Sequence, residues 1–104
     1  MEKIGDINIF KMLGDNTRLR IVKLLINKNM DVNSIVDAIK CDQPLVSHKL
    51  KELRENGIVM SYREGKNIVY KITDKSISSV IRSAEKAGKI IDYACKCVEC
   101  DDKA

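Results

Sequence analysis

The chain has 104 residues, of which 44% are hydrophobic and 33% charged, and its formal net charge is +4. This length and composition are typical of one soluble globular domain and exclude a second independent domain. No apolar run approaches the roughly 18 residues that a membrane-spanning helix needs, and the N-terminus lacks the charged-then-apolar order of a signal peptide. We therefore expect a cytoplasmic protein without a membrane partner.

The surplus of positive charge is concentrated in the middle of the chain. Residues 43–73 hold six Lys and Arg against three Asp and Glu, whereas residues 74–104 hold six of each kind. A local basic patch is typical of a protein that binds a polyanion, because binding to a membrane surface favours a basic amphipathic helix with large apolar residues opposite. The charge pattern therefore favours nucleic acid.

The four cysteines are also unevenly placed. Cys41 stands alone, and Cys95, Cys97 and Cys100 lie within the last ten residues. A disulfide scaffold would spread its cysteines along the chain, whereas clustered cysteines in a reducing compartment more often bind metal or sense redox state.

Apolar periodicity predicts three short helices in the first 42 residues. Gly14 ends the first, Asp15 or Asn16 caps the second, and Asp31 caps the third. We expect these helices over about residues 4–13, 16–27 and 32–39, with a tight turn at residues 40–42.

A fourth helix is expected over about residues 43–56. Pro44 suits its first turn, where the missing N–H costs nothing, and Gly57 ends it. The pattern then changes from helical to alternating, which predicts a hairpin over about residues 58–73 with its turn at Glu64-Gly65.

Asp74 caps a last helix, expected over about residues 74–94 and followed by a cysteine-rich tail at residues 95–104. Its small and apolar residues recur in steps of three and four, which is the spacing of helices that pair. They are Ile77, Ile81, Ala84, Gly88, Ile91 and Cys95. A dimer interface is the expected use of so long a seam.

The order of elements predicts a mainly α protein with a small β-hairpin. It is that of a single winged helix-turn-helix domain over residues 1–104, in which the helix at residues 43–56 enters the major groove of DNA. Polar side chains near the start of that helix can contact base edges, and basic ones on the helix and hairpin can contact phosphates. The predicted DNA-binding residues are Gln43, Ser47, His48, Lys49, Lys51, Arg54, Arg63 and Lys66. His48 is the only histidine, so we assign it to DNA rather than to a metal.

Three segments, at residues 13–21, 43–59 and 63–70, resemble the ArsR/SmtB family of dimeric metal-sensing repressors. One departure is that the family's usual histidine, two residues after the serine, is Lys49 here, with histidine one position earlier at His48. The resemblance implies a homodimer held by its first and last helices, which binds a palindromic operator as a repressor and leaves it when an inducer binds.

Two metal sites associated with the family are absent from the sequence. The arsenic-type site uses cysteines in the third helix, where residues 32–36 have none, and the zinc-type site needs histidines that residues 74–94 lack. The remaining candidate ligands are Cys95, Cys97 and Cys100. Three soft thiolates without an obvious fourth ligand favour As(III) or Sb(III) as the inducer, with Cd(II), Pb(II) or Zn(II) as alternatives.

Helix geometry constrains this cluster. On a continuous helix Cys97 would lie about 200° from Cys95, so the two thiols could not share a ligand. We therefore expect the helix to end or unwind near Cys95. Binding would then pull Cys97 and Cys100 toward Cys95 and change the spacing of the two recognition helices.

Other interpretations of the cysteines stay open. A thiol redox or persulfide sensor of the same fold could use Cys41 or a pair of tail cysteines, beside Lys40 and Lys96. A plain DNA-binding protein could carry a structural zinc ion in the tail. The tail could also be an inert chain end, with Cys41 a small packing residue, which we favour for Cys41. An enzyme is not expected, because the sequence has no nucleotide loop, no paired carboxylates in a suitable context and no nucleophile near its histidine.

Overall fold

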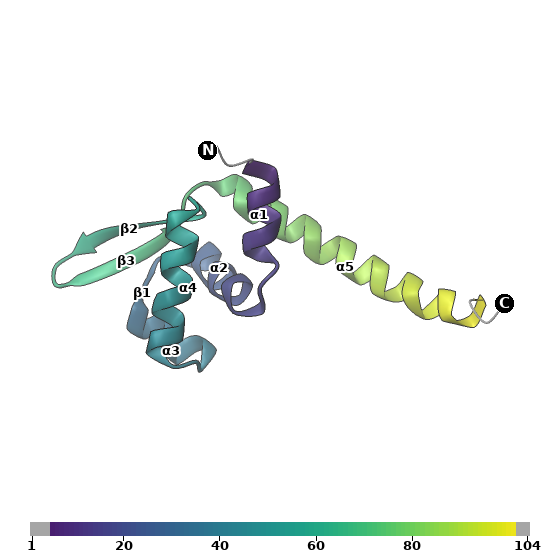
Figure 1. Ribbon diagram of the computed structural model, residues 1–104, viewed down its shortest axis with the longest axis horizontal. Coiled ribbons are helices and arrows are strands. Elements are labelled where there is room, and N and C mark those ends of the chain that lie inside the picture. Colours follow the sequence, from purple (N-terminus) through teal and green to yellow (C-terminus); the bar gives the residue numbers. More distant parts are fainter. Residues whose placement is uncertain (1–4, 102–104) are drawn as a thin grey trace.

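The computed structural model describes the backbone of residues 5–101 and the side chains of residues 5–95. This part of the chain holds five helices and three strands: α1 (Gly5–Leu13), α2 (Asn16–Asn27), β1 (Met30–Asp31), α3 (Val32–Ile39), α4 (Gln43–Glu55), β2 (Val59–Glu64), β3 (Asn67–Ile72) and α5 (Lys75–Asp101). Figure 1 shows the helices α1 to α4 gathered in a central bundle, from which the β2–β3 hairpin and α5 project in opposite directions. The predicted mainly helical, winged helix-turn-helix order is confirmed.

Short-range polar contacts set the helix boundaries. The carboxylate of Asp15 accepts a hydrogen bond from the backbone N–H of Arg18 (2.9 Å), and Asp31 accepts one from Ser34 (2.9 Å). These bonds satisfy N–H groups at helix starts that have no partner within the helix. α3 ends at Ile39, and its C-cap residue Lys40, in the left-handed conformation (φ 60°), begins the tight turn into α4.

The sheet has one strand more than the predicted hairpin. Its order is β1-β3-β2, and all pairings are antiparallel. β1 pairs Met30 with Tyr70 and Asp31 with Val69. The prediction missed β1 because two residues are too few to show the alternation that marks a strand. The predicted turn is present, with Gly65 at φ 63°, a conformation that favours glycine.

The core is built mainly from α2, α3 and α4. Its fully buried members are Ile21, Val22, Leu25, Ile35, Val46, Leu50, Leu53 and Val59. Burial of each large aliphatic side chain contributes roughly 1.5–3 kcal/mol, so these contacts hold α4 firmly against the rest of the bundle.

α5 extends beyond its predicted end. It runs without a break from Lys75 to Asp101, so the expected end or unwinding near Cys95 is wrong. Neither glycine nor proline follows Gly88, and nothing else in this stretch of sequence stops a helix. The cysteine segment therefore begins within the helix rather than in a tail after it.

The seam predicted along α5 has two different environments. Ile77 and Ile81 are buried in the chain's own core, which the prediction of a dimer seam did not foresee. Every residue from Arg82 to Cys95 is exposed. The core in one chain is thus complete near Ile81, and α5 continues well past it. Among the described residues no helix is long and apolar enough to cross a membrane.

Candidate nucleic-acid interface and cysteine cluster

α4 has one buried face and one exposed face. Val46, Leu50 and Leu53 are fully buried, at the spacing of an amphipathic helix. Pro44 lies in the first turn, and the N-cap residue Asp42 makes no side-chain hydrogen bond to that turn. The start of α4 therefore carries the positive end of the helix dipole without a side-chain cap, an arrangement that suits phosphate.

Most of the predicted DNA-binding side chains are exposed. On α4 and the hairpin these are Gln43, Ser47, His48, Lys51, Arg54, Arg63 and Lys66. Ser47, Lys51 and Arg54 follow one another in steps of four and three residues, which places them on one side of the helix. The structure therefore combines polar and basic groups on the solvent face of the helix that a winged helix-turn-helix protein uses for recognition.

The hairpin is basic at its tip and is joined to the rest of the chain along its length. Arg63 and Lys66 lie on either side of the Glu64-Gly65 turn. Nearer the core, Asn29 Nδ2 donates a hydrogen bond to the Tyr62 hydroxyl (3.2 Å), which ties β2 to the segment before β1. Both tip cations are exposed.

Lys49 differs from the other predicted contacts. Its side chain is only 18% exposed, and its Nζ lies 3.5 Å from Asp15 Oδ1 and 3.7 Å from Glu52 Oε1. Two carboxylates thus already neutralise its charge. This placement favours a structural role for Lys49 between α2 and α4 over a contact with phosphate.

Arg18 is not among the residues predicted from the sequence, and it lies at the centre of the same cluster. Its Nη1 donates to Glu52 Oε1 (2.9 Å), its Nε to the carbonyl of Met12 (2.8 Å) and its Nη2 to that of Lys11 (3.3 Å). The side chain is 12% exposed. A signal was present in the sequence, since a cation in the first turn of a helix opposes the helix dipole and needs a compensating partner.

Two acidic groups of this cluster are stabilised in their ionised form. Burial acts to raise the pKa of Glu52, but the hydrogen bond and charge of Arg18, with the charges of Lys49 and His48, outweigh it and lower that pKa. The backbone hydrogen bond from Arg18, aided by the charge of Lys49, lowers the pKa of Asp15. His48 Nε2 lies 3.6 Å from Glu52 Oε2, so the cluster reaches the exposed face of α4.

The cysteines are distributed over distant parts of the molecule. Cys41 is half-buried in the turn between α3 and α4, where its Sγ lies 3.8 Å from the carbonyl of Ile39 and 4.0 Å from Arg20 Nη1. Cys95 is exposed and belongs to α5. The C-terminal part of this helix projects away from the bundle (Figure 1). The side chains of Cys97 and Cys100 lie outside the described residues. Among the side chains that are described, no three His, Cys, Asp or Glu groups are gathered as a metal site requires.

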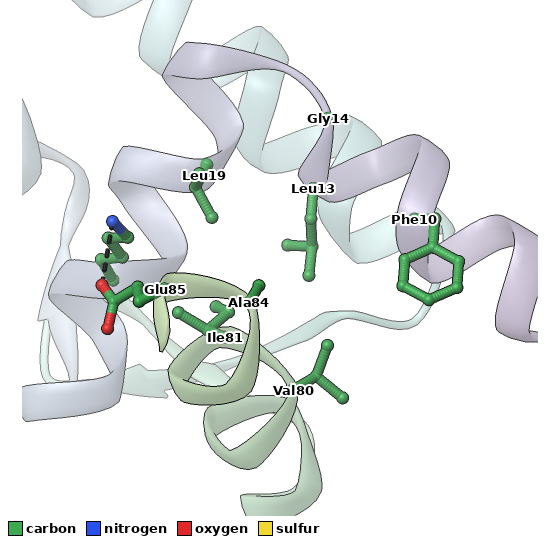
Figure 2. A pocket seen from close by; sticks show the side chains of 9 residues that line it. Phe10, Leu13, Gly14, Leu19, Val80, Ile81, Ala84 and Glu85 are labelled. Carbon is green, nitrogen blue, oxygen red and sulfur yellow. Dashed lines mark ion pairs between the residues drawn. The ribbon is translucent and has the colours of Figure 1, made fainter. Parts of the chain in front are cut away.

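An apolar groove lies between α1, α2 and α5 (Figure 2). Its volume is about 340 Å³, and its lining includes Phe10, Leu13, Leu19, Val80, Ile81 and Ala84. An ion pair between Lys23 and Glu85 (3.0 Å) joins α2 to α5 beside it. Phe10 is 70% exposed. Large apolar side chains clustered on a surface generally mark an interaction site, so this groove is a candidate for one.

Comparison with known proteins identifies the family of this fold. Residues 15–61, which include α2, α3 and α4, match the family described as bacterial regulatory protein, arsR family. An uncharacterised helix-turn-helix transcriptional regulator from Methanocaldococcus jannaschii is 42% identical over 79 residues, which are 75% of this chain and 89% of that protein. The chain belongs to the ArsR family.

Two further matches extend over more of this ArsR-family chain. The arsenical resistance operon repressor of Escherichia coli K12 is 35% identical over 92 residues, covering 88% of this chain and 73% of the repressor. A homodimeric winged helix-turn-helix DNA-binding domain from Mycobacterium bovis, described as a possible ArsR-family transcriptional regulator, has a TM-score of 0.75 at 24% identity and covers 82% of this chain and 79% of its own. Family and fold together make this chain a DNA-binding transcription regulator.

Proposed function

We propose that this ArsR-family protein is a homodimeric repressor that binds a palindromic operator and is released by a thiophilic metalloid, As(III) or Sb(III). The metalloid binds Cys95, Cys97 and Cys100. One observation carries the proposal: α5 leaves the core near Ile81, and the same long helix continues into a three-cysteine segment. The regulator thus has a candidate ligand site at the far end of a candidate dimer helix.

Operator binding is assigned to α4 and the hairpin. Gln43, Ser47 and His48, near the start of α4, have the hydrogen-bonding groups that distinguish bases in the major groove. Lys51 and Arg54, with Arg63 and Lys66 of the hairpin, supply charges that position the protein on phosphates without reading sequence. A single recognition helix contacts too few base pairs for selectivity, so two copies on a two-fold symmetric site are needed.

The dimer interface is assigned to α1 and α5. Large apolar side chains are exposed on both helices, namely Ile7, Phe10, Ile90, Ile91 and Tyr93. The groove between α1, α2 and α5 continues this surface, and the structural neighbour from M. bovis is itself homodimeric. A second copy of the chain would cover these groups, at the gain in free energy that accompanies apolar burial.

The inducer is assigned from ligand chemistry. Three thiolates without histidine suit a soft ion that accepts three sulfur ligands, whereas zinc in structural sites takes four ligands. The E. coli relative, which covers most of this chain, is an arsenical resistance operon repressor. Both points favour As(III) or Sb(III) over Cd(II), Pb(II) and Zn(II).

The continuity of α5 suggests how inducer binding would release the protein from DNA. Thiols that point to different sides of one helix cannot meet on one ion, so capture by all three cysteines of a chain requires the last turns to unwind. Between Arg82 and Cys95 every residue is exposed in the single chain, so few intrachain contacts oppose such unwinding. Unwinding would shorten the dimer helix, and the ligand would favour the dimer arrangement that binds DNA poorly.

The test is a titration of the DNA complex with all cysteines reduced at the start. A duplex selected from a random pool by the unaltered protein serves as operator, and fluorescence anisotropy reports binding after addition of arsenite, antimonite, Cd(II), Pb(II), Zn(II) or an oxidant. Arsenite should weaken binding by about 5- to 150-fold, the usual range for coupling between two sites. Cys97→Ser and Cys100→Ser should bind the duplex normally and resist arsenite, whereas Cys41→Ser should respond like the unaltered protein.

Three other outcomes would contradict the assignment of As(III) or Sb(III) at the three cysteines. Normal release of both tail variants by arsenite contradicts a site at the cysteine segment. Release by Zn(II), Cd(II) or Pb(II) alone assigns a different metal. Insensitivity to arsenite, together with oxidant-induced release that a thiol reductant reverses, identifies a redox sensor.

A further inference from the structure

Arg18 connects three helices through one side chain. Its guanidinium donates to the carbonyls of Lys11 (3.3 Å) and Met12 (2.8 Å), in the last turn of α1, and to Glu52 of α4 (2.9 Å). A guanidinium is a planar, rigid fork of donors, so all three bonds form together only at one relative placement of α1 and α4. The low exposure of the side chain, 12%, limits competition from water.

A second contact joins the same two helices. Asn8 Nδ2, nearer the start of α1, donates to the carbonyl of Asn56, the residue that follows α4 (3.4 Å). α1 is thus attached to the C-terminal half of α4 at two points along its length. Hydrogen bonds fix both the separation and the rotation of two helices, which apolar packing alone constrains less.

The outer side of α1 carries different chemistry. Ile7 and Phe10 are 60% and 70% exposed, and Phe10 lines the apolar groove beside α5. Figure 2 shows Phe10 and Leu13 of α1 facing the α5 side chains Val80 and Ala84 across this groove. α1 therefore has its apolar side in the proposed dimer interface and its polar contacts on the recognition helix.

We infer that Arg18 and Glu52 are positioning residues for operator recognition: their ion pair fixes α4 against α1 and thereby sets the angle at which α4 meets DNA. The inference rests on the proposed homodimer, in which α1 helps to hold the two copies together. Lys49, 3.7 Å from Glu52, and Asp15, 3.5 Å from Lys49, extend the same cluster to the start of α2.

Because Glu52 is negatively charged, a positioning role and a purely electrostatic role predict opposite changes in DNA affinity when it is replaced by glutamine. Glu52 lies on the recognition helix, 3.6 Å from His48, where a negative charge opposes the approach of phosphates. Glu52→Gln makes the chain more positive and, without a positioning role, strengthens binding to any duplex. A positioning role predicts weaker binding to the operator instead.

The experiment compares Glu52→Gln, Arg18→Gln and the double variant with a matched control, Glu64→Gln. Glu64 is an exposed carboxylate of the hairpin, so its substitution makes the same change in charge. The unaltered full chain first selects a duplex from a random pool. Anisotropy then gives the affinity of each variant for this duplex and for a shuffled one of equal composition, and circular dichroism in urea reports folding. Arg18→Lys, which keeps the charge but lacks the fork, separates the loss of hydrogen-bond geometry from the loss of charge.

We expect Glu52→Gln, Arg18→Gln and Arg18→Lys each to lower affinity for the selected duplex by about tenfold, within the range of coupled ion-pair partners. Binding to the shuffled duplex should strengthen for Glu52→Gln, stay equal for Arg18→Lys, which keeps the charge, and weaken for Arg18→Gln by less than binding to the selected duplex does. The double variant should bind no worse than either single one, because both changes remove one interaction. Glu64→Gln should strengthen binding to both duplexes.

Two results overturn the inference. One is tighter binding of Glu52→Gln to the selected duplex, as for Glu64→Gln, and the other is a loss in the double variant equal to the product of the single losses. Failure of the unaltered chain to select any duplex is a separate result, which overturns DNA binding itself and the inference with it.

Discussion

Replacing Lys51 with glutamine removes one positive charge from the exposed side of α4, where Lys51 lies between Ser47 and Arg54, without entering the core. In a homodimer the change occurs twice. Each lost phosphate contact reduces the slope of log affinity against log salt concentration by about 0.9, so the slope should become shallower by about 1.8. Over a fourfold rise in salt concentration, the unaltered protein should therefore lose about twelve times more affinity than the variant.

The assay is fluorescence anisotropy of a duplex selected by the unaltered protein, measured over a series of salt concentrations. Lys86→Gln is the matched control, because Lys86 is exposed on α5, outside α4 and the hairpin, and its loss changes the net charge equally. The control should keep the slope of the unaltered protein. An unchanged slope for Lys51→Gln refutes a phosphate contact at this position, and an equal change in Lys86→Gln shows that only net charge was measured.

Three further predictions concern stability and assembly. Leu50 is fully buried, so Leu50→Ala should lower the free energy of unfolding by about 2–5 kcal/mol, measured in urea; a smaller loss contradicts the close packing of α4. The hydrogen bond from Arg18 lowers the pKa of Asp15 below its usual 3.8, so the carboxylate stabilises the fold above this pH and the benefit is lost as pH falls through the lowered pKa. The difference in urea midpoint between the unaltered protein and Asp15→Asn should thus be present at neutral pH and shrink in acid, and a pH-independent difference contradicts this cause. Phe10→Glu should leave the fold of one chain intact, since Phe10 is exposed, but yield monomers in sedimentation equilibrium; a dimer of unchanged affinity removes α1 from the interface.

Features that act within a few residues could be predicted from the sequence. Asp31 caps α3 through a bond to Ser34, three residues away, and Pro44 marks the first turn of α4 because it needs no N–H partner there. Gly65 marks a turn that requires positive φ. With the helical spacing of the buried residues, such local signals were sufficient to predict the helix-turn-helix and the hairpin.

Features that depend on distant parts of the chain could not be predicted in this way. Arg18 and Glu52 are 34 residues apart, and so are Lys49 and Asp15, so their pairing follows only from the fold. Lys49 and Lys51 look alike in the sequence, since both are basic residues of the same helix. In the fold, Lys49 lies beside two carboxylates, whereas Lys51 is exposed to solvent. The prediction for the end of α5 failed for another reason, because it applied to the free chain a geometry that only the binding of one ion by all three cysteines requires.

The length of α5 restricts how a ligand at the cysteines can act on DNA binding. About 30 Å of helix separates Ile81 from Asp101. The described side chains from Arg82 to Cys95 are exposed, and the Lys23–Glu85 ion pair that joins this part of α5 to α2 lies in solvent, where it couples the two helices only weakly. In the proposed homodimer, a signal from the proposed ligand site would therefore pass mainly through the partner subunit, and then through α1 and the Arg18–Glu52 ion pair. The proposed mechanism thus makes dimerisation a condition for induction as well as for operator selectivity, so a monomeric variant that still binds the metalloid should show no change in its residual DNA affinity.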